Sequence, residues 1–183
     1  AQDGILLLTF KDQVIFEKDE VVKQDGGPYT VFTPYSRKWK SQLEASLLKP
    51  HNCELSAERF VPQKRQGIIS LEQLGFEKTD FIYPAPVISK KTILDYKSQR
   101  DFPSQSGTTR LGVHLRFGTV SIRRLVALTW SIAEMESWLN ELIWREFFMQ
   151  ILFHFPHVVD RAFRSEYDAI VWRNDEMEFQ AWK

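Results

Sequence analysis

The sequence has little of three features that would identify a class of protein at once. Cys53 is its only cysteine, which excludes a disulfide framework and a cysteine metal cluster and favours a reducing compartment. No apolar run approaches about eighteen residues and no signal peptide is visible, so we expect a soluble, cytoplasmic chain without a membrane partner. An excess of one charge is also missing, since 24 Lys and Arg balance 24 Asp and Glu. This balance argues against a protein whose main task is nonspecific phosphate binding, although a local basic stripe could still bind nucleic acid.

Aromatic side chains, in contrast, are abundant. The 183 residues include six Trp and fourteen Phe, and 43% of the chain is hydrophobic. This length and apolar content suffice for one ordinary domain with a real core, and the aromatic load fits a large core or stacking surfaces. The chain begins at Ala1 almost directly with a strand-like run and stops without a polar tail. We therefore expect an excised fragment of a longer protein.

Hydrophobic periodicity predicts a mainly α fold with a short β remnant at the N-terminus. Strand-like runs occur at residues 5–10 and 13–17, before a turn rich in glycine and proline. Helical spacing begins near residue 35 and returns at 86–98, 110–117, 121–130 and 133–155, where Pro156 closes the longest helix. In "SLEQLG", Ser70 is a predicted N-cap, Gln73 completes a capping box and Gly75 is a stop signal.

The stretch "WLNELIWREFFMQ" places charged residues in a helix that is apolar on most sides. Trp138, Glu141, Trp144, Arg145 and Phe148 fall within one arc of about 120°. A buried carboxylate and guanidinium need partners. They could form an i,i+4 ion pair, or the arc could line a pocket for something planar and polar.

The stretch "SGTTRLGVHLRFG" and the residues before it have the groups that bind phosphates. Gly107 permits close backbone approach, and Thr108 and Thr109 supply hydroxyls and N–H groups at a predicted helix start. A plain helix N-cap made by threonine is the alternative. Upstream, Tyr96 and Arg100 are side chains common in anion recognition, and they equally fit surface residues at a helix end.

Taken together, these stretches resemble the DNA photolyase and cryptochrome family. "DYKSQRDFPSQSGTTRLGVHLRFGTVSIRRL" followed by "WLNELIWREFF" is similar to the opening half of the family's helical flavin-binding domain. "YTVFTPYSRKWK" matches the passage from the interdomain linker, and "VWRNDEMEFQAW" matches the segment before the second flavin-contacting motif. The resemblance implies that residues 1–33 are a strand remnant and linker of the α/β antenna domain. Residues 34–183 would then be the first half of the helical domain that binds FAD and DNA.

The resemblance also implies a set of FAD-binding residues. Those that would hold the phosphates are Tyr96, Thr108, Thr109, Arg110, Leu111 and Gly112, and Trp138 would lie beside the flavin. The family often has Ser where Gly112 stands, so one side-chain hydrogen bond would be lost. No motif in the chain indicates which antenna chromophore the other domain would carry. His114, His154 and His157 show no metal-ligand spacing, and we expect no metal site.

A second set would bind damaged DNA and move electrons. Arg100 would face a DNA phosphate, and the lesion pocket would include Glu141, Trp144, Arg145 and Phe148. Trp144 would offer a flat face to an extruded pyrimidine dimer, while Glu141 would bind the polar edge of a thymine and take part in catalysis. Trp172 matches the surface-exposed member of the tryptophan chain that passes electrons to the flavin, and packing between helices is its alternative role.

The function implied by the resemblance is light-driven repair of cyclobutane pyrimidine dimers by electron transfer from reduced FAD. Glu141 favours dimer repair, because animal-type cryptochromes and (6-4) photoproduct enzymes usually have Gln there. A cryptochrome-like blue-light photoreceptor and a non-catalytic DNA-binding relative are the alternatives. We expect a bacterial-type cytoplasmic protein, at the nucleoid during repair. The chain alone should be inactive and should self-associate through exposed apolar helix faces.

Overall fold

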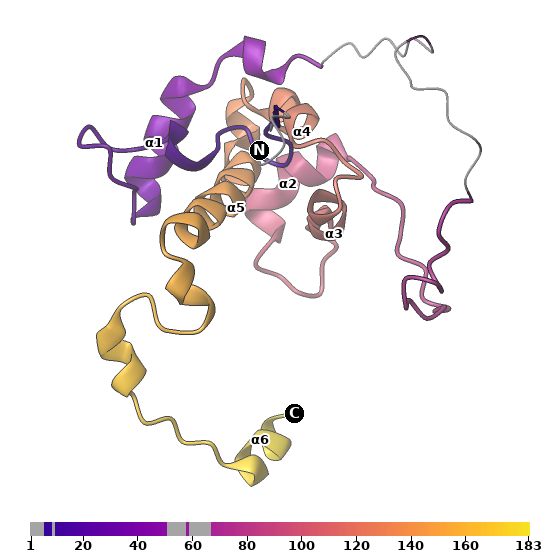
Figure 1. Ribbon diagram of the computed structural model, residues 1–183, viewed down its shortest axis with the longest axis vertical. Helices are drawn as coiled ribbons and strands as arrows, with labels where there is room; N and C mark the ends of the chain where they lie inside the picture. Colours follow the sequence, from indigo (N-terminus) through magenta and orange to yellow (C-terminus); the bar gives the residue numbers. More distant parts are fainter. Residues whose placement is uncertain (1–5, 9, 51–57, 59–66) are drawn as a thin grey trace. The chain divides into compact units, whose positions relative to one another are not determined.

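The computed structural model describes residues 6–8, 10–50, 58 and 67–183, and their regular structure is helical (Figure 1). The α-helices are α1 (Phe32–Gln42), α2 (Lys90–Gln99), α3 (Gly112–Arg116), α4 (Ile122–Thr129), α5 (Glu136–His154) and α6 (Glu176–Trp182). Short 3₁₀ turns are η1 (Lys18–Glu20), η2 (Ala45–Leu48), η4 (Ala133–Met135), η5 (Pro156–Val159) and η6 (Ser165–Ala169). The predicted mainly α class is confirmed. None of the described helices is long and apolar enough to cross a membrane.

The strand predicted at residues 13–17 is wrong. This segment has no neighbouring strand, because the backbone N–H groups of Ile15 and Phe16 donate to the carboxylate of Glu146 instead. Of the run at 5–10, residues 5 and 9 lie outside the described residues and the others are in no strand. The β pairing within the described chain is one isolated antiparallel bridge, Val22 with Pro28.

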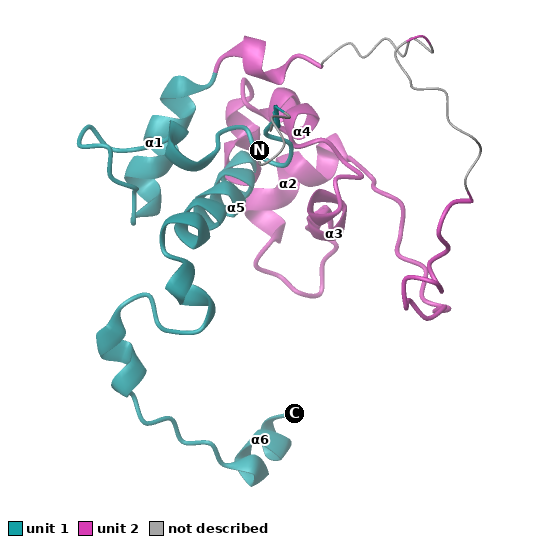
Figure 2. Ribbon diagram, in the orientation of Figure 1, with its two compact units in different colours: residues 1–43, 139–183 teal, residues 44–138 magenta. Residues whose placement is uncertain are grey.

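The chain divides into two compact units (Figure 2). Unit 1 comprises residues 1–43 and 139–183, and unit 2 comprises residues 44–138. The domain boundary predicted between residues 33 and 34 concerns a longer protein and stays a prediction.

Unit 1 has a core in which the N-terminal segment, α1 and α5 meet. Tyr35 and Trp39 lie one turn apart on α1, so both face the same side, and each is only 1% exposed. The ring of Trp39 meets that of Phe16 edge-on at 5.5 Å, and Tyr35 contacts Phe147 of α5 at 5.2 Å. No residue from 156 to 183 is buried.

Unit 2 is built from α2, α3 and α4 with the turns η2 and η4. Its buried apolar side chains are Leu48, Ile93, Leu111, Leu115, Val120, Ile122, Leu125, Val126, Met135 and Trp138. Turn η2 lies beside α4, and η4 lies beside α2. Helix α2 begins later than predicted because the Ser89 hydroxyl accepts the N–H of Thr92 and so caps the helix there. Helix α3 is shorter than predicted because Arg110 has a φ of +51°, which is incompatible with a right-handed helix.

The predicted capping box in "SLEQLG" is confirmed, although it closes a turn and not a helix. The N–H of Ser70 donates to Gln73 Oε1 at 2.9 Å, and the N–H of Gln73 donates to Ser70 Oγ at 3.3 Å. Gly75 has a φ of +83°, the left-handed conformation expected of a stop.

Candidate functional site

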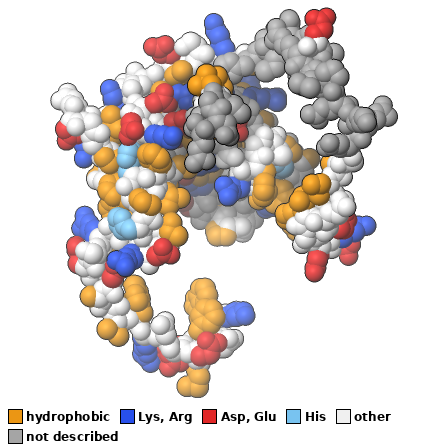
Figure 3. Space-filling view, viewed as in Figure 1, with side chains coloured by type: hydrophobic (Ala, Val, Ile, Leu, Met, Phe, Trp, Pro, Cys, Tyr) orange, Lys and Arg blue, Asp and Glu red, His pale blue; other side chains and the backbone are white. Residues whose placement is uncertain are grey.

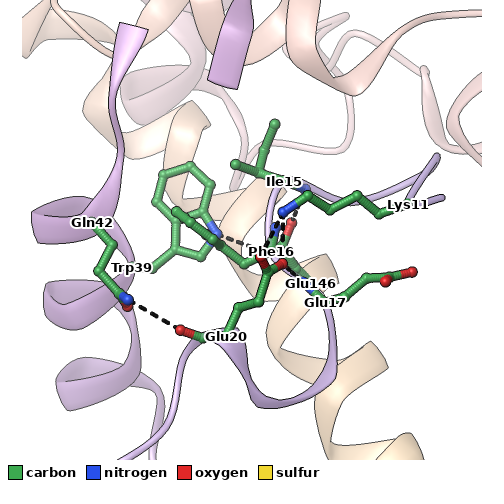
Figure 4. Close-up of polar contacts among 8 residues, drawn as sticks. All are labelled: Lys11, Ile15, Phe16, Glu17, Glu20, Trp39, Gln42 and Glu146. Atoms are coloured by element: carbon green, nitrogen blue, oxygen red, sulfur yellow. Dashed lines mark hydrogen bonds and ion pairs between the residues drawn. The ribbon is translucent and has the colours of Figure 1, made fainter. Parts of the chain in front are cut away.

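The buried carboxylate of α5 is Glu146, a residue that sequence reasoning missed. Its side chain is 3% exposed and accepts three hydrogen bonds (Figure 4): from Ile15 N at 2.7 Å, Phe16 N at 2.9 Å and Trp39 Nε1 at 2.6 Å. Burial raises the pKa of Glu146 to about 7, although these donors and the charge of Arg145 lower it. Glu146 thus joins the N-terminal segment, α1 and α5.

Arg145 contacts the same segment from the neighbouring position on α5. Its Nη1 donates to the carbonyl oxygen of Gln13 at 2.7 Å, and its Nη2 donates to Gln13 Oε1 at 3.4 Å. One turn after Glu146, Gln150 Nε2 donates to the carbonyl oxygen of Val21 at 3.0 Å. The side chains of Arg145, Glu146 and Gln150 therefore supply hydrogen bonds to backbone that would otherwise need a sheet.

Trp144 lies in an aromatic cluster within unit 1. Its ring is stacked on that of Phe32 with centroids 3.6 Å apart and 5° between the planes. Phe148 lies at 5.3 Å and 22° from Trp144, and Phe147 meets Trp144 edge-on at 5.6 Å. Glu141, one turn before Trp144, is half-buried, while Phe148 is 59% exposed. The predicted arc therefore combines a carboxylate with flat aromatic surface.

The predicted phosphate-binding run lies in unit 2, where three of its members line one pocket. Thr109, Arg110 and Leu111 border a pocket of about 490 Å³ together with residues 81–87 and His114. The hydroxyl of Tyr83 donates to the carbonyl oxygen of Arg110 at 3.2 Å, so Tyr83 supports the residue with positive φ. No sequence pattern pointed to Tyr83 as a support residue.

Two glycines of this region differ in what surrounds them. A Cβ on Gly107 would lie 2.6 Å from the Cβ of Gln99 and 2.9 Å from its backbone, so Gly107 allows a close approach to the end of α2. Its close approach to a phosphate stays a prediction. A Cβ on Gly112 would meet nothing within 4 Å. The serine that the family often has at this position would therefore fit.

The remaining predicted site residues lie in both units. In unit 2, the guanidinium of Arg100 lies 5.6 Å from the ring centroid of Tyr96, and Trp138 is 4% exposed. Trp172, in unit 1, is 72% exposed, and its role in electron transfer stays a prediction. Within the described residues, no three His, Cys, Asp or Glu side chains are placed to hold a metal ion, and Cys53 lies outside them.

Two family models match the ends of the chain. The model described as DNA photolyase matches residues 1–54, and the model described as the FAD binding domain of DNA photolyase matches residues 138–183.

Curated relatives match nearly the whole chain. A deoxyribodipyrimidine photo-lyase of Synechococcus sp. is 29% identical, over 98% of this chain and 42% of that protein. One from Alkalihalophilus pseudofirmus is also 29% identical, over 100% of this chain and 41% of its own. The crystal structure of a class III photolyase from Agrobacterium tumefaciens has a TM-score of 0.66 at 24% identity, covering 99% of this chain and 42% of that one. The chain thus has the photolyase fold and spans about two fifths of the length of these relatives.

Proposed function

The chain belongs to the DNA photolyase and cryptochrome family, and on that premise we propose that its function is light-driven repair of cyclobutane pyrimidine dimers in DNA. The chain would supply the residues that stack on the lesion and part of those that hold FAD. Because it spans about two fifths of its relatives' length, we expect the chain by itself to bind FAD weakly and not to complete repair.

One observation carries the proposal: α5 has Glu141, Trp144 and Phe148 at successive turns of one face. A flat indole gives an extruded base a surface on which to stack, a contact that does not depend on base sequence. A carboxyl group one turn away can bind the polar edge of a thymine through hydrogen bonds. Half-burial of Glu141 and Trp144 excludes part of the competing water, which strengthens both contacts.

FAD is the cofactor that this proposal requires, and the residues that would hold its phosphates belong to unit 2. Tyr96 and the run Thr108–Gly112 would bind the pyrophosphate, since Thr109, Arg110 and Leu111 already border a pocket. Trp138 would lie beside the isoalloxazine ring. Reduced FAD, when bound and excited, would supply the electron that opens the cyclobutane ring and would take it back once the ring has split.

Three further roles belong to the same proposal. Arg100 would contact a DNA phosphate, Arg145 would stay near the lesion pocket while holding Gln13, and Trp172 would receive or pass electrons at the surface. We also propose a cytoplasmic location, with association to the nucleoid during repair.

The first test is whether the chain prefers damaged DNA. Fluorescence anisotropy would compare a duplex that carries one thymine cyclobutane dimer with the same duplex undamaged. We expect tighter binding of the dimer duplex, lost in Trp144→Leu and kept in Trp182→Leu, a control tryptophan that is 81% exposed. Equal binding of the two duplexes would contradict the proposal.

A spectrum taken after incubation with FAD and desalting tests the cofactor. Blue absorbance retained by the chain would show that the Tyr96, Thr108–Gly112 and Trp138 side suffices, and illumination with dimer DNA would follow. Flavin photoreduction without dimer cleavage would favour a photoreceptor. Dimer DNA bound and released unchanged by a flavin-loaded chain would favour a non-catalytic relative.

A further inference from the structure

We infer that Phe32 is a positioning residue for lesion binding, because its ring covers one face of Trp144 and so fixes where a damaged base can stack. The inference rests on the proposed function, in which Trp144 contacts the lesion. It adds a residue from α1 to a surface otherwise made by α5.

The contact is a full face-to-face stack. The ring centroids of Phe32 and Trp144 lie 3.6 Å apart with only 5° between the planes. The Phe179–Trp182 pair, stacked on α6, is much looser at 6.1 Å and 28°. At 3.6 Å the two faces are in van der Waals contact, so no base can enter between them.

Phe32 is held in place by its own helix. It is the first residue of α1 and follows Val31, which has extended backbone, so the helix start sets the position of Phe32. Tyr35 anchors the same helix in the core. Phe147 meets Phe32 edge-on at 5.9 Å and Trp144 edge-on at 5.6 Å, so it contacts both rings of the stack. Its ring also lies 5.2 Å from that of Tyr35, tilted by 55°.

The packing of Phe32 and Phe147 against Trp144 limits where a base can stack on the indole. Phe32 closes one face of Trp144, and Phe148 is also stacked on Trp144 with centroids 5.3 Å apart and 22° between the planes. A base would therefore stack on the part of the indole that these two rings leave open. Fixing the indole before DNA arrives removes the entropy loss of ordering it on binding. Phe32 therefore strengthens lesion binding without touching the lesion.

The test is a double-mutant cycle on the full chain with the thymine-dimer duplex and its undamaged twin. Phe32→Leu removes the ring and keeps apolar bulk, so we expect binding of the dimer duplex to weaken about three- to tenfold, with binding of the undamaged duplex unchanged. Phe32→Tyr keeps the ring and should retain wild-type affinity. In a Trp144→Leu background, Phe32→Leu should have no further effect.

Controls separate positioning from a structural role. Phe179→Leu breaks the stacked Phe179–Trp182 pair of α6 and should leave both affinities unchanged. Urea unfolding confirms that each variant is folded, and Phe32→Met replaces Phe32→Leu should the latter not fold.

Each other outcome has a definite meaning. A silent Phe32→Leu beside a clear preference of the wild type for the dimer overturns only the positioning role. The positioning role is also overturned if Phe32→Leu weakens binding of both duplexes equally, or if it still weakens binding of the dimer duplex in the Trp144→Leu background. A wild type with no dimer preference overturns the proposed function, and the role of Phe32 falls with it.

Discussion

At the scale of single residues, Glu146 makes the stability of the chain depend on pH. Burial raises its pKa from 4.5 to about 7, so the folded chain holds a proton that the unfolded chain releases above pH 4.5. The contribution of Glu146 to the free energy of unfolding should therefore be highest below pH 4.5. It should decline by roughly 3 kcal/mol as pH rises through about 7, then level off.

Urea unfolding of wild type and Glu146→Gln at pH 4.5, 6 and 8 measures this contribution as the difference between their free energies of unfolding. The pH dependence that comes from the other carboxylates is the same in both proteins and cancels in this difference. The glutamine variant should lack the slope. It should also be less stable at pH 4.5 by about 1–3 kcal/mol, because its NH₂ group would face one of three donors. Parallel pH curves for the two proteins would show that Glu146 does not titrate in this range.

Gly112 and Gly107 form a matched pair for a second prediction. Gly112→Ser places a hydroxyl in open space at the start of α3, where it can bind a phosphate oxygen, so FAD should bind about two- to tenfold more tightly. Gly107→Ser drives a Cβ into Gln99 and should lower the free energy of unfolding by roughly 1–3 kcal/mol. Flavin fluorescence titration and urea unfolding report the two effects. A folded Gly112→Ser chain with unchanged FAD affinity would argue against the phosphate role of this run.

At the scale of elements, the sequence predicted helices well and the N-terminal segment badly. Helices α2, α4 and α5 follow from apolar spacing, and Pro156 marks the end of α5, whereas the Ser89 cap that sets the start of α2 was not predicted. Residues 13–17 have the apolar content of a strand, yet their N–H groups bind a carboxylate about 130 residues away. No local pattern contains a partner at that separation, and so the sequence pointed to Glu141 where the structure buries Glu146.

Helix α5 and this segment yield a third prediction. Arg145→Leu removes the charged donor to Gln13 and should loosen residues 13–16, with a loss of about 1.5–3 kcal/mol in unfolding free energy. Hydrogen exchange at the amides of Ile15 and Phe16 should accelerate, while amides of α4 in unit 2 keep their protection. Unchanged exchange at Ile15 and Phe16 would mean that Glu146 alone holds the segment.

At the scale of the whole molecule, the predicted site residues belong to two compact units. The FAD-phosphate run, Arg100 and Trp138 belong to unit 2, and the lesion-stacking residues and Trp172 belong to unit 1. The sequence predicted which residue types matter, because phosphate and base recognition use recognisable groups. It could not predict the support residues Phe32, Tyr83 and Glu146, since each acts through a contact made only by the fold.

The exposed apolar surface leads to a last prediction, that the chain self-associates. On α5, Phe148, Met149, Leu152 and Phe153 are 38–59% exposed and repeat every turn, so they form one apolar stripe. Figure 3 shows further hydrophobic side chains on the surface of the segment from η5 to α6. Contiguous apolar surface of this kind usually finds a partner, and a second copy offers the same stripe.

Sedimentation velocity across a range of protein concentrations would detect the association as a rising mean mass. Leu152→Glu introduces a charge into the stripe and should shift the equilibrium toward monomer, because the carboxylate would lose water on association. Gln24→Glu adds the same charge at an exposed polar position outside both the stripe and the segment from η5 to α6, and should leave the association unchanged. A wild type that stays monomeric at every concentration would show that this apolar stripe can stay exposed to water without causing association. A Leu152→Glu chain that associates like wild type would instead direct attention to the apolar side chains between η5 and α6.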